Sequence, residues 1–334
     1  MGSAPLHCRS LCAALLLTLL FVSQPFTTKA NGSISEPLSI RGINYGGRFI
    51  PERWLDLPGM GPLYGSATPG CSSAYPRPCV LSTCDLAAWQ PDEAGDRMLK
   101  YLNDSILESD FKRIATEGFN FVRLPLGYWQ LVESDVAPDA PSHTAVRWHA
   151  LQKMLPAAAY RIHILRVLRY ASENNLRVLL DLHGAPGGQS INQCTGCATS
   201  CEGSGCEEEA HYFDRPRNHA VAIAAVVELA KLCALAGPTC FGVELLNEPA
   251  QPEPLGGGNC NRTSLLENYY VKAILAARNA GLPPAVPIVI MDCKQRALGV
   301  APCTSRRSGL VHTLRLTPPH LIGSRTSSHL ASIS

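Results

Sequence analysis

Short apolar segments alternate along this chain with longer segments of helical periodicity, and this alternation constrains the fold more than any other feature. Helical patterns run from Ser109 to Gly118 and over residues 157–174, 218–236 and 265–280. Strands that alternate with helices form a parallel sheet, and a chain of this length suits a barrel. The sequence therefore predicts an α/β fold of the (β/α) barrel type. The five strand-like runs are residues 38–45, 119–126, 176–182, 241–246 and 286–291.

Two of the helical segments carry finer signals. Ser109 is a favoured N-cap residue and Gly118 is a favoured residue just after a helix, so we expect them to bound the first helix. In the second helix, apolar residues at helical spacing predict the buried face. These residues are Ile162, Leu165, Leu168 and Ala171.

Two long interruptions break the rhythm, at residues 51–100 and 184–215. Each follows a strand, so both are expected on the face of a barrel that carries functional loops. Both contain cysteines, for which disulfide bonds are the expected state in an exported chain. A zinc site is the alternative for the second cluster. The cysteines are Cys71, Cys79 and Cys84 in the first interruption and Cys194, Cys197, Cys201 and Cys206 in the second.

Residues 1–30 have the pattern of a secretory signal peptide. Arg9 precedes an apolar run over residues 11–22, and small residues, Thr28 and Ala30, stand where a signal peptidase reads the chain. This run is too short to span a bilayer, and we expect no later segment to be long enough either. We therefore expect a secreted protein, extracellular or in the cell wall, with no membrane attachment after cleavage. Three sequons, at Asn31, Asn103 and Asn261, fit a glycoprotein.

The charge balance limits the class of partner. A formal net charge of +2 on 334 residues gives no field strong enough to indicate nucleic acid. A neutral or sugar-like substrate fits this balance, and we expect a monomer that needs no cofactor and no metal. Residues 31–294 are expected to form the folded domain. Residues 295–334 are basic and rich in Ser, Thr and Pro, without any Asp or Glu, so we expect a disordered tail there.

Polar side chains stand at the ends of four of the predicted strands. Glu248 follows the fourth run after Asn247, at a proline where strand pairing should stop. Arg123 lies near the end of the second run, His183 follows the third, and Glu52 lies in the loop after the first. Because the carboxyl ends of parallel strands meet at one rim, we expect these five side chains to converge into an active site.

These segments resemble glycoside hydrolase family 5, the cellulase-type family, and within it the fungal exo-β-1,3-glucanase branch. The resemblance runs from about residue 38 to 294 and implies a TIM (β/α)8 barrel and retaining hydrolysis of a β-glycosidic bond in a β-glucan. The matching segments are RGINYGG at 41–47, GFNFVRLPLGYW at 118–129, DLHGAPG at 181–187, ELLNEP at 244–249 and VIMD at 289–292.

The resemblance also assigns roles to the candidate residues. Glu248 takes the place of the catalytic acid/base, and Asn247 that of the residue that binds the sugar 2-hydroxyl. Arg123 and His183 take the places of supports for the catalytic carboxylates, and Glu52 that of a substrate-binding residue. A protonated carboxyl beside the departing oxygen and an amide on the 2-hydroxyl agree with the chemistry of glycoside hydrolysis.

The chain departs from the family pattern after its fifth strand. A retaining enzyme needs a second carboxylate about 5 Å from the first, and in this family it lies on the seventh strand. Only about five βα units are present, so the barrel is expected to be incomplete, and we interpret the chain as a C-terminally truncated member. The acidic residues after Glu248, none of them in a matching motif, are Glu253, Glu267 and Asp292.

Two other classes of function remain open at this point. A non-catalytic secreted carbohydrate-binding protein would keep the sugar-facing cleft without the chemistry, and a disulfide-rich cell-surface protein would need neither. Trp54, Tyr128 and Trp129 could stack on sugar rings in an enzyme or in a binding protein, or could equally pack in the core.

Overall fold

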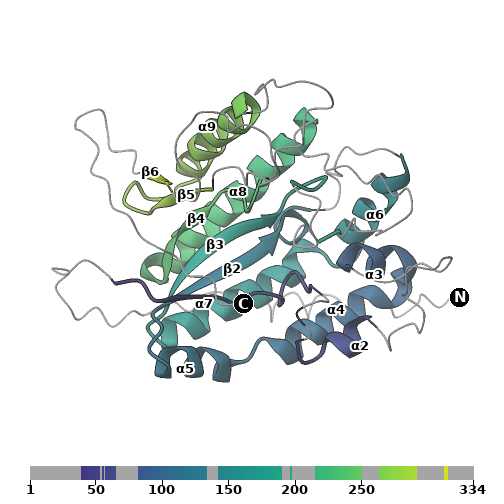
Figure 1. The fold of residues 1–334 in the computed structure, drawn as a ribbon, viewed down its shortest axis with the longest axis horizontal. Helices are drawn as coiled ribbons and strands as arrows, with labels where there is room; N and C mark the ends of the chain where they lie inside the picture. The colour runs from purple at the N-terminus through teal and green to yellow at the C-terminus, as the bar shows by residue number, and fades with distance from the viewer. Residues whose placement is uncertain are drawn as a thin grey trace, which may run out of the picture. The chain divides into compact units, whose positions relative to one another are not determined.

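Five parallel strands and one antiparallel strand form a single sheet in the computed structural model of the chain (Figure 1). The structure describes residues 39–52, 55, 57–64, 82–133, 142–189, 196–197, 215–249, 263–291 and 312–314. The predicted signal peptide, Trp54 and most of the tail lie outside these residues. The strands, in their order across the sheet, are β1 (Gly42–Asn44), β2 (Phe121–Gly127), β3 (Arg177–Gly184), β4 (Cys240–Glu244), β5 (Ile288–Ile290) and β6 (His312–Leu314).

The order of the parallel strands across the sheet equals their order along the chain. Each new strand is therefore added on the same side of the previous one, as in a barrel, whereas a doubly wound sheet reverses direction at its middle. All five predicted strands are confirmed, and so is the α/β class. The strand β6 was not predicted, and it pairs antiparallel with β5 at the edge of the sheet.

Eight α-helices are described, four of which occupy the segments predicted to be helical. The other four lie in or beside stretches that we read only as interruptions. One of them shows a local signal, because Ser82 and Asp85 form a reciprocal capping box at its start. The helices are α2 (Met60–Tyr64), α3 (Thr83–Trp89), α4 (Pro91–Ser105), α5 (Glu108–Thr116), α6 (Ser142–Lys153), α7 (Ala157–Glu173), α8 (Pro216–Ala236) and α9 (Thr263–Asn279).

Alternation along the strands gives the sheet two different buried faces. Helices α7 and α8 pack against β3, and α8 also packs against β4 (Figure 1). On the other face, Phe121, Leu179 and Val289 form a small buried cluster, against which Ile40 and Phe241 pack. In a barrel this second face lines the interior. The apolar cluster lies below the polar strand ends and gives them a rigid base.

Two details of the helices differ from the prediction. Helix α5 begins at Glu108 after Leu107, so Ser109 is not its N-cap, because two acidic residues in the first turn already complement the helix dipole. Helix α7 is rotated relative to the predicted face: Ile162 is 58% exposed, whereas His163, Ile164 and Val167 are buried. Several apolar residues of α7 admit two overlapping stripes, and spacing alone selected the wrong one.

Helix α8 also corrects an expectation about length. Residues Pro216–Thr239 form a 24-residue helical segment with a mean hydropathy of 2.0, which is long and apolar enough to cross a membrane. Our expectation that no later segment reaches this length was therefore wrong. Half of the window is buried inside the fold, against β3, β4 and α9, as in the core helix of a globular domain.

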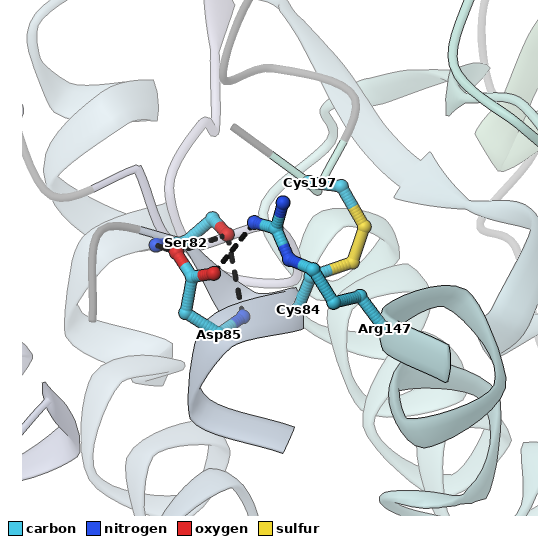
Figure 2. Close-up of a disulfide and its surroundings, with 5 residues drawn as sticks. All are labelled: Ser82, Cys84, Asp85, Arg147 and Cys197. Carbon is cyan, nitrogen blue, oxygen red and sulfur yellow. Dashed lines mark hydrogen bonds and ion pairs between the residues drawn. A yellow bond between two sulfur atoms is a disulfide. The ribbon is translucent and has the colours of Figure 1, made fainter. Parts of the chain in front are cut away.

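One disulfide bond joins the two long interruptions. Cys84 in α3 is bonded to Cys197, with a Cα–Cα distance of 4.9 Å (Figure 2). Asp85 beside it accepts hydrogen bonds from Ser82 and an ion pair from Arg147, both drawn in Figure 2. A second disulfide, Cys233–Cys240, joins α8 to β4. Disulfide formation is thus confirmed for four cysteines, while Cys71, Cys79, Cys194, Cys201 and Cys206 lie outside the described residues.

The same region buries the aromatic pair that follows β2. Tyr128 and Trp129 have no exposed surface, and a Cβ atom on Gly196 would stand 2.2 Å from the Trp129 ring. The segment that carries Cys197 therefore lies directly against this ring. The suggestion that Tyr128 and Trp129 stack on sugar rings is wrong, because both belong to the core.

Candidate active site

Arg123 is the centre of a group of polar side chains at the carboxyl ends of the parallel strands. Its guanidinium makes a two-pronged ion pair with Glu244 at the end of β4, with Nε 2.7 Å from Oε2 and Nη2 2.8 Å from Oε1. Nη2 also lies 2.9 Å from Asp181 Oδ2 on β3 and donates to Asn247 Oδ1 at 2.9 Å. Nη1 reaches Asn44 Oδ1, from β1, at 3.4 Å. One arginine thus connects four strands.

Asp181 and His183 lie two residues apart on β3, so their side chains leave the same face of the sheet. The imidazole Nδ1 lies 2.6 Å from Asp181 Oδ2. A carboxylate at this distance favours the tautomer with the proton on Nδ1, which leaves Nε2 as an acceptor. Nε2 faces the side-chain amide nitrogen of Asn247 at 3.5 Å. His183 is therefore held between Asp181 and Asn247.

Burial and charge act against each other in this group. Burial alone would lower the pKa of Arg123, but the negative charges of Asp181 and Glu244 outweigh it and raise the pKa well above its ordinary value. Burial raises the pKa of the Glu244 carboxyl, and the charge of Asp181 adds to this rise, while Arg123 opposes it. The arginine thus stays charged and stabilises two carboxylates that water does not reach.

Asn247 and Glu248 form the turn that leaves β4. The Asn247 backbone N–H donates to the Leu182 carbonyl at 2.9 Å, which extends the contact between β3 and β4 beyond the strands. Glu248 is partly exposed and has a φ of 36°, in the left-handed region that residues other than glycine rarely adopt. Its charge contributes to the raised pKa of Arg123, so its carboxylate lies within electrostatic range of the guanidinium.

Glu52 lies eight residues after β1 and is partly exposed. Burial raises the pKa of the nearby Tyr64 hydroxyl, and the charges of Asp85 and Glu52 add to this rise. Glu52 thus faces the neighbourhood of α2 and α3. Its role as a substrate-binding residue stays a prediction.

The structure brings Arg123, His183, Asn247 and Glu248 to one rim, as the strand-end argument predicts. It also assigns contacts there to Asp181 and Glu244, which we did not single out. A signal for both was present, because each is an acidic residue inside an apolar strand, and a carboxylate that is fully buried needs a partner. The sequence does not show that both share Arg123.

Among the residues that the structure describes, no group of three or more His, Cys, Asp or Glu side chains is arranged to hold a metal ion. The zinc alternative for the second cysteine cluster concerns residues that are mostly outside this part of the chain. The paired carboxylates around Arg123 are occupied by the guanidinium. The chemistry that this arrangement offers is that of a positioned carboxyl group, Glu248, beside a fixed amide, Asn247.

Comparison with known proteins places this geometry in context. The profile of the family described as Cellulase (glycosyl hydrolase family 5) matches residues 87–294. A glucan 1,3-beta-glucosidase of Blumeria graminis is 31% identical over 71% of this chain and 47% of its own length. A probable glucan endo-1,6-beta-glucosidase B of Aspergillus flavus is 26% identical over 80% of this chain and 59% of its own length.

The fold also matches a solved structure. The rutinosidase from Aspergillus niger superposes with a TM-score of 0.55 at 16% identity, over 75% of this chain and 62% of that protein. At this identity the match concerns the fold alone, and it fits five parallel strands that form part of a TIM barrel. The chain spans about half the length of the curated relatives that it matches.

Proposed function

This chain belongs to the cellulase family of glycosyl hydrolases, family 5, and on that premise we propose that it carries the acid/base half of a β-glucan hydrolase site. Glu248 is the proposed acid/base of a retaining, two-carboxylate mechanism. Its carboxyl group protonates the departing glycosidic oxygen and later removes a proton from the attacking water. The observation that carries the proposal is the contact of Arg123 with both Glu244 and Asn247, directly before Glu248.

The contacts around Asn247 support its proposed role. Its side-chain oxygen accepts from Arg123, so its amide nitrogen points away from the guanidinium as a donor. A donor fixed in this way can bind the 2-hydroxyl of a sugar, a bond that strengthens as positive charge develops on the ring. Since Arg123 is charged and doubly paired, the amide cannot reorient without breaking a charge-assisted hydrogen bond.

We propose that the nucleophile is not among the strands that this chain supplies. Asp181 and Glu244 are buried and ion-paired with Arg123, which suits supports and not an attacking group. Glu267 lies on the exposed side of α9. A carboxylate about 5 Å from Glu248, as retention requires, therefore has to come from elsewhere.

The proposed substrate is a β-glucan or a related oligosaccharide. The two curated relatives described above are named for glucan 1,3- and 1,6-glucosidase activity, and the near-neutral charge of this chain suits an uncharged polysaccharide. Laminarin and aryl β-glucosides are suitable probes.

A small anion can test the proposed acid/base in the absence of the nucleophile. Azide attacks C1 from the face opposite the aryloxy group, the C1–O bond breaks, and the oxygen takes the proton of Glu248, which yields an α-glucosyl azide. We expect little turnover of phenyl β-glucoside in buffer and clear turnover with azide. Robust turnover of laminarin in buffer, lost in Glu248→Gln, would refute the missing nucleophile and uphold Glu248.

The leaving group separates acid catalysis from collapse of the site. Glu248→Gln should lower azide-supported turnover of phenyl β-glucoside by about a hundredfold or more, because phenoxide needs a proton. Turnover of 2,4-dinitrophenyl β-glucoside should change little, because that group departs without one. Glu267→Gln, on the exposed side of α9, is the matched control and should alter neither rate. Equal losses on both substrates would argue against the acid role.

Binding of laminari-oligosaccharides without any turnover, even with azide, would instead support the carbohydrate-binding alternative. Isothermal titration with the intact chain decides this, since it needs no chemistry. Failure to bind any glycan would favour the cell-surface protein.

We also propose that the protein is exported after removal of residues 1–30 and is a monomer. Two disulfide bonds in the described part of the chain support an oxidising compartment. A secreted product whose mass begins at Asn31, and light scattering at the mass of one chain, are the expected results. Retention of the full N-terminus in the cell would contradict export.

A further inference from the structure

Gln189 is a buried glutamine in the turn after β3, and its side chain reaches the turn that carries Glu248. Gly187 and Gly188 have φ values of 74° and 75°, which glycine adopts without steric cost. The Gly188 N–H bonds back to the Ala185 carbonyl at 3.0 Å. This tight turn directs the chain back toward the strand ends and leaves Gln189 with no exposed surface.

The side chain of Gln189 makes three hydrogen bonds, all with backbone groups. Its Oε1 accepts from the Ala185 N–H at 3.0 Å, and its Nε2 donates to the carbonyls of His183 at 2.7 Å and Asn247 at 2.9 Å. Both donors and an acceptor position of the amide are thus used. The opposite orientation of the amide would place its oxygen against two carbonyls, so the contacts themselves fix the assignment.

The bond to Asn247 acts on the peptide group that precedes the Glu248 Cα. The carbonyl of Asn247 and the N–H of Glu248 belong to the same planar unit. The N–H end donates to Met291 Sδ at 3.0 Å, and a thioether is a weak acceptor. The carbonyl end receives the stronger bond, from Gln189. The orientation of this peptide plane therefore depends chiefly on Gln189.

The φ angle of Glu248 makes this orientation important. At 36° the residue is in a region that side chains other than glycine disfavour, and such a conformation persists only where its surroundings hold it. Because φ describes rotation about the bond between this peptide and Cα, a flipped peptide would redirect the Glu248 carboxylate. Gln189 also binds the His183 carbonyl, so it couples the two turns.

We propose that Gln189 is a positioning residue that holds the Asn247–Glu248 peptide, and with it the direction of the Glu248 carboxylate. For its effect on turnover this inference rests on the proposed function, whereas the contact itself does not. Gln189 is separated from Asn247 by 58 residues, so the sequence gives no sign of the bond.

Amide hydrogen exchange, followed by NMR, tests the contact directly. In Gln189→Met, which keeps the size of the side chain, the Glu248 amide should exchange at least about tenfold faster, since the bond that fixes its peptide is lost. The Leu245 amide, which donates to Val289 on β5, should keep its protection. Gln152→Met is the matched control, because Gln152 is also buried and binds a backbone carbonyl, that of Glu133 in the turn after η2 (Tyr128–Gln130).

The control variant should leave both amides unchanged. Equal acceleration of Leu245 and Glu248 in Gln189→Met would overturn the proposal, because it would indicate general destabilisation. The wild-type protein supplies a second test that needs no variant. The side-chain NH2 protons of Gln189 should exchange slowly, and rapid exchange of both would overturn the proposal as well.

Kinetics tests the consequence for catalysis. In azide-supported turnover of phenyl β-glucoside, Gln189→Met should lower kcat by about tenfold or more with KM within about twofold of wild type, since the sugar still binds but the acid is misdirected. Gln152→Met should retain both values. A rise in KM alone would overturn the positioning role. If the wild-type chain shows no azide-supported turnover, the proposed function fails, while the exchange experiment still decides the role of Gln189.

Discussion

At the scale of single residues, Glu244 links the site to the stability of the fold. The raised pKa of its carboxyl means that the folded state holds a proton more tightly than the unfolded chain does. The free energy of unfolding should therefore fall as the pH rises from the ordinary glutamate value of about 4.3 through the raised folded value. Glu244→Gln removes the titrating group, so this decline should vanish.

Urea unfolding of wild type and Glu244→Gln, between about pH 4 and 8, measures this difference. The gap between the two stability curves should change with pH across that range. Parallel curves would show that Glu244 titrates alike in the folded and unfolded chain, contrary to its burial beside Asp181.

His163, in α7, titrates in the opposite sense. Burial, helped by the charge of Arg166, lowers the pKa of His163 to about 4. The unfolded chain therefore binds the proton more readily, and the free energy of unfolding should drop as the pH falls from about 6.5 to about 4, by roughly 2–3 kcal/mol. His163→Gln should abolish this acid sensitivity. His149→Gln, which replaces an exposed histidine of α6, should leave it intact.

Residue contacts were predictable only where a strand end announced them. Arg123, His183, Asn247 and Glu248 were found because polar residues interrupt apolar runs at the ends where parallel strands meet. The pair of Arg123 with Glu244 bridges 121 residues, and pattern reasoning contains no information about which buried charge meets which. Gln189 was missed for the same reason.

At the scale of elements, Gly95 shows where two helices approach most closely. It lies inside α4, and a Cβ atom there would stand 2.7 Å from the backbone oxygen of Met154, in the turn between α6 and α7. Gly95→Ala should lower the free energy of unfolding by about 1–3 kcal/mol despite the better helix propensity of alanine. Gly61→Ala in α2, where the added methyl meets nothing within 4 Å, should be neutral or stabilise by up to about 1 kcal/mol.

Thermal or urea unfolding of the two variants decides the matter. If Gly95→Ala proved as stable as Gly61→Ala, the packing of α4 on that turn would be wrong.

The two disulfide bonds should contribute unequally to stability. Cys84–Cys197 closes a loop of 113 residues and Cys233–Cys240 one of 7. In the chain-entropy model, their removal costs about 5 and about 2 kcal/mol, respectively. Paired alanine variants, Cys84→Ala with Cys197→Ala and Cys233→Ala with Cys240→Ala, measured by urea unfolding without reductant, compare them. A larger loss from the short loop would contradict this account of how the two interruptions are tied.

Elements with a strong period were predictable, and elements defined by neighbours were not. Strands β2 and β3 are buried on both faces and read as continuous apolar runs, whereas β6 has three residues and exists only through its pairing with β5. Helices α3 and α4 lie among prolines and cysteines that suggested a loop. The signal that marks them, a capping box and a proline at the helix start, is local and easily overlooked.

At the scale of the whole molecule, the sheet has two edges instead of a closed ring. Strand β1 forms one edge, where Ile43 is 38% exposed, and β6 covers β5 at the other. Open edges expose unpaired backbone groups, which a closed barrel avoids. The family, the α/β fold and the rim were all recognisable from the sequence, because the motifs lie in the strand ends that the structure brings together.

The central claim is that Glu248, oriented by its neighbours, faces a glycosidic oxygen. A crystal structure of this chain with laminaritriose tests it directly, and without a nucleophile the sugar should remain intact. The account predicts a glycosidic oxygen within about 2.6–3.2 Å of the Glu248 carboxyl and a 2-hydroxyl on the Asn247 amide. A sugar bound away from this rim, or a Glu248 carboxyl directed away from it, would contradict the account.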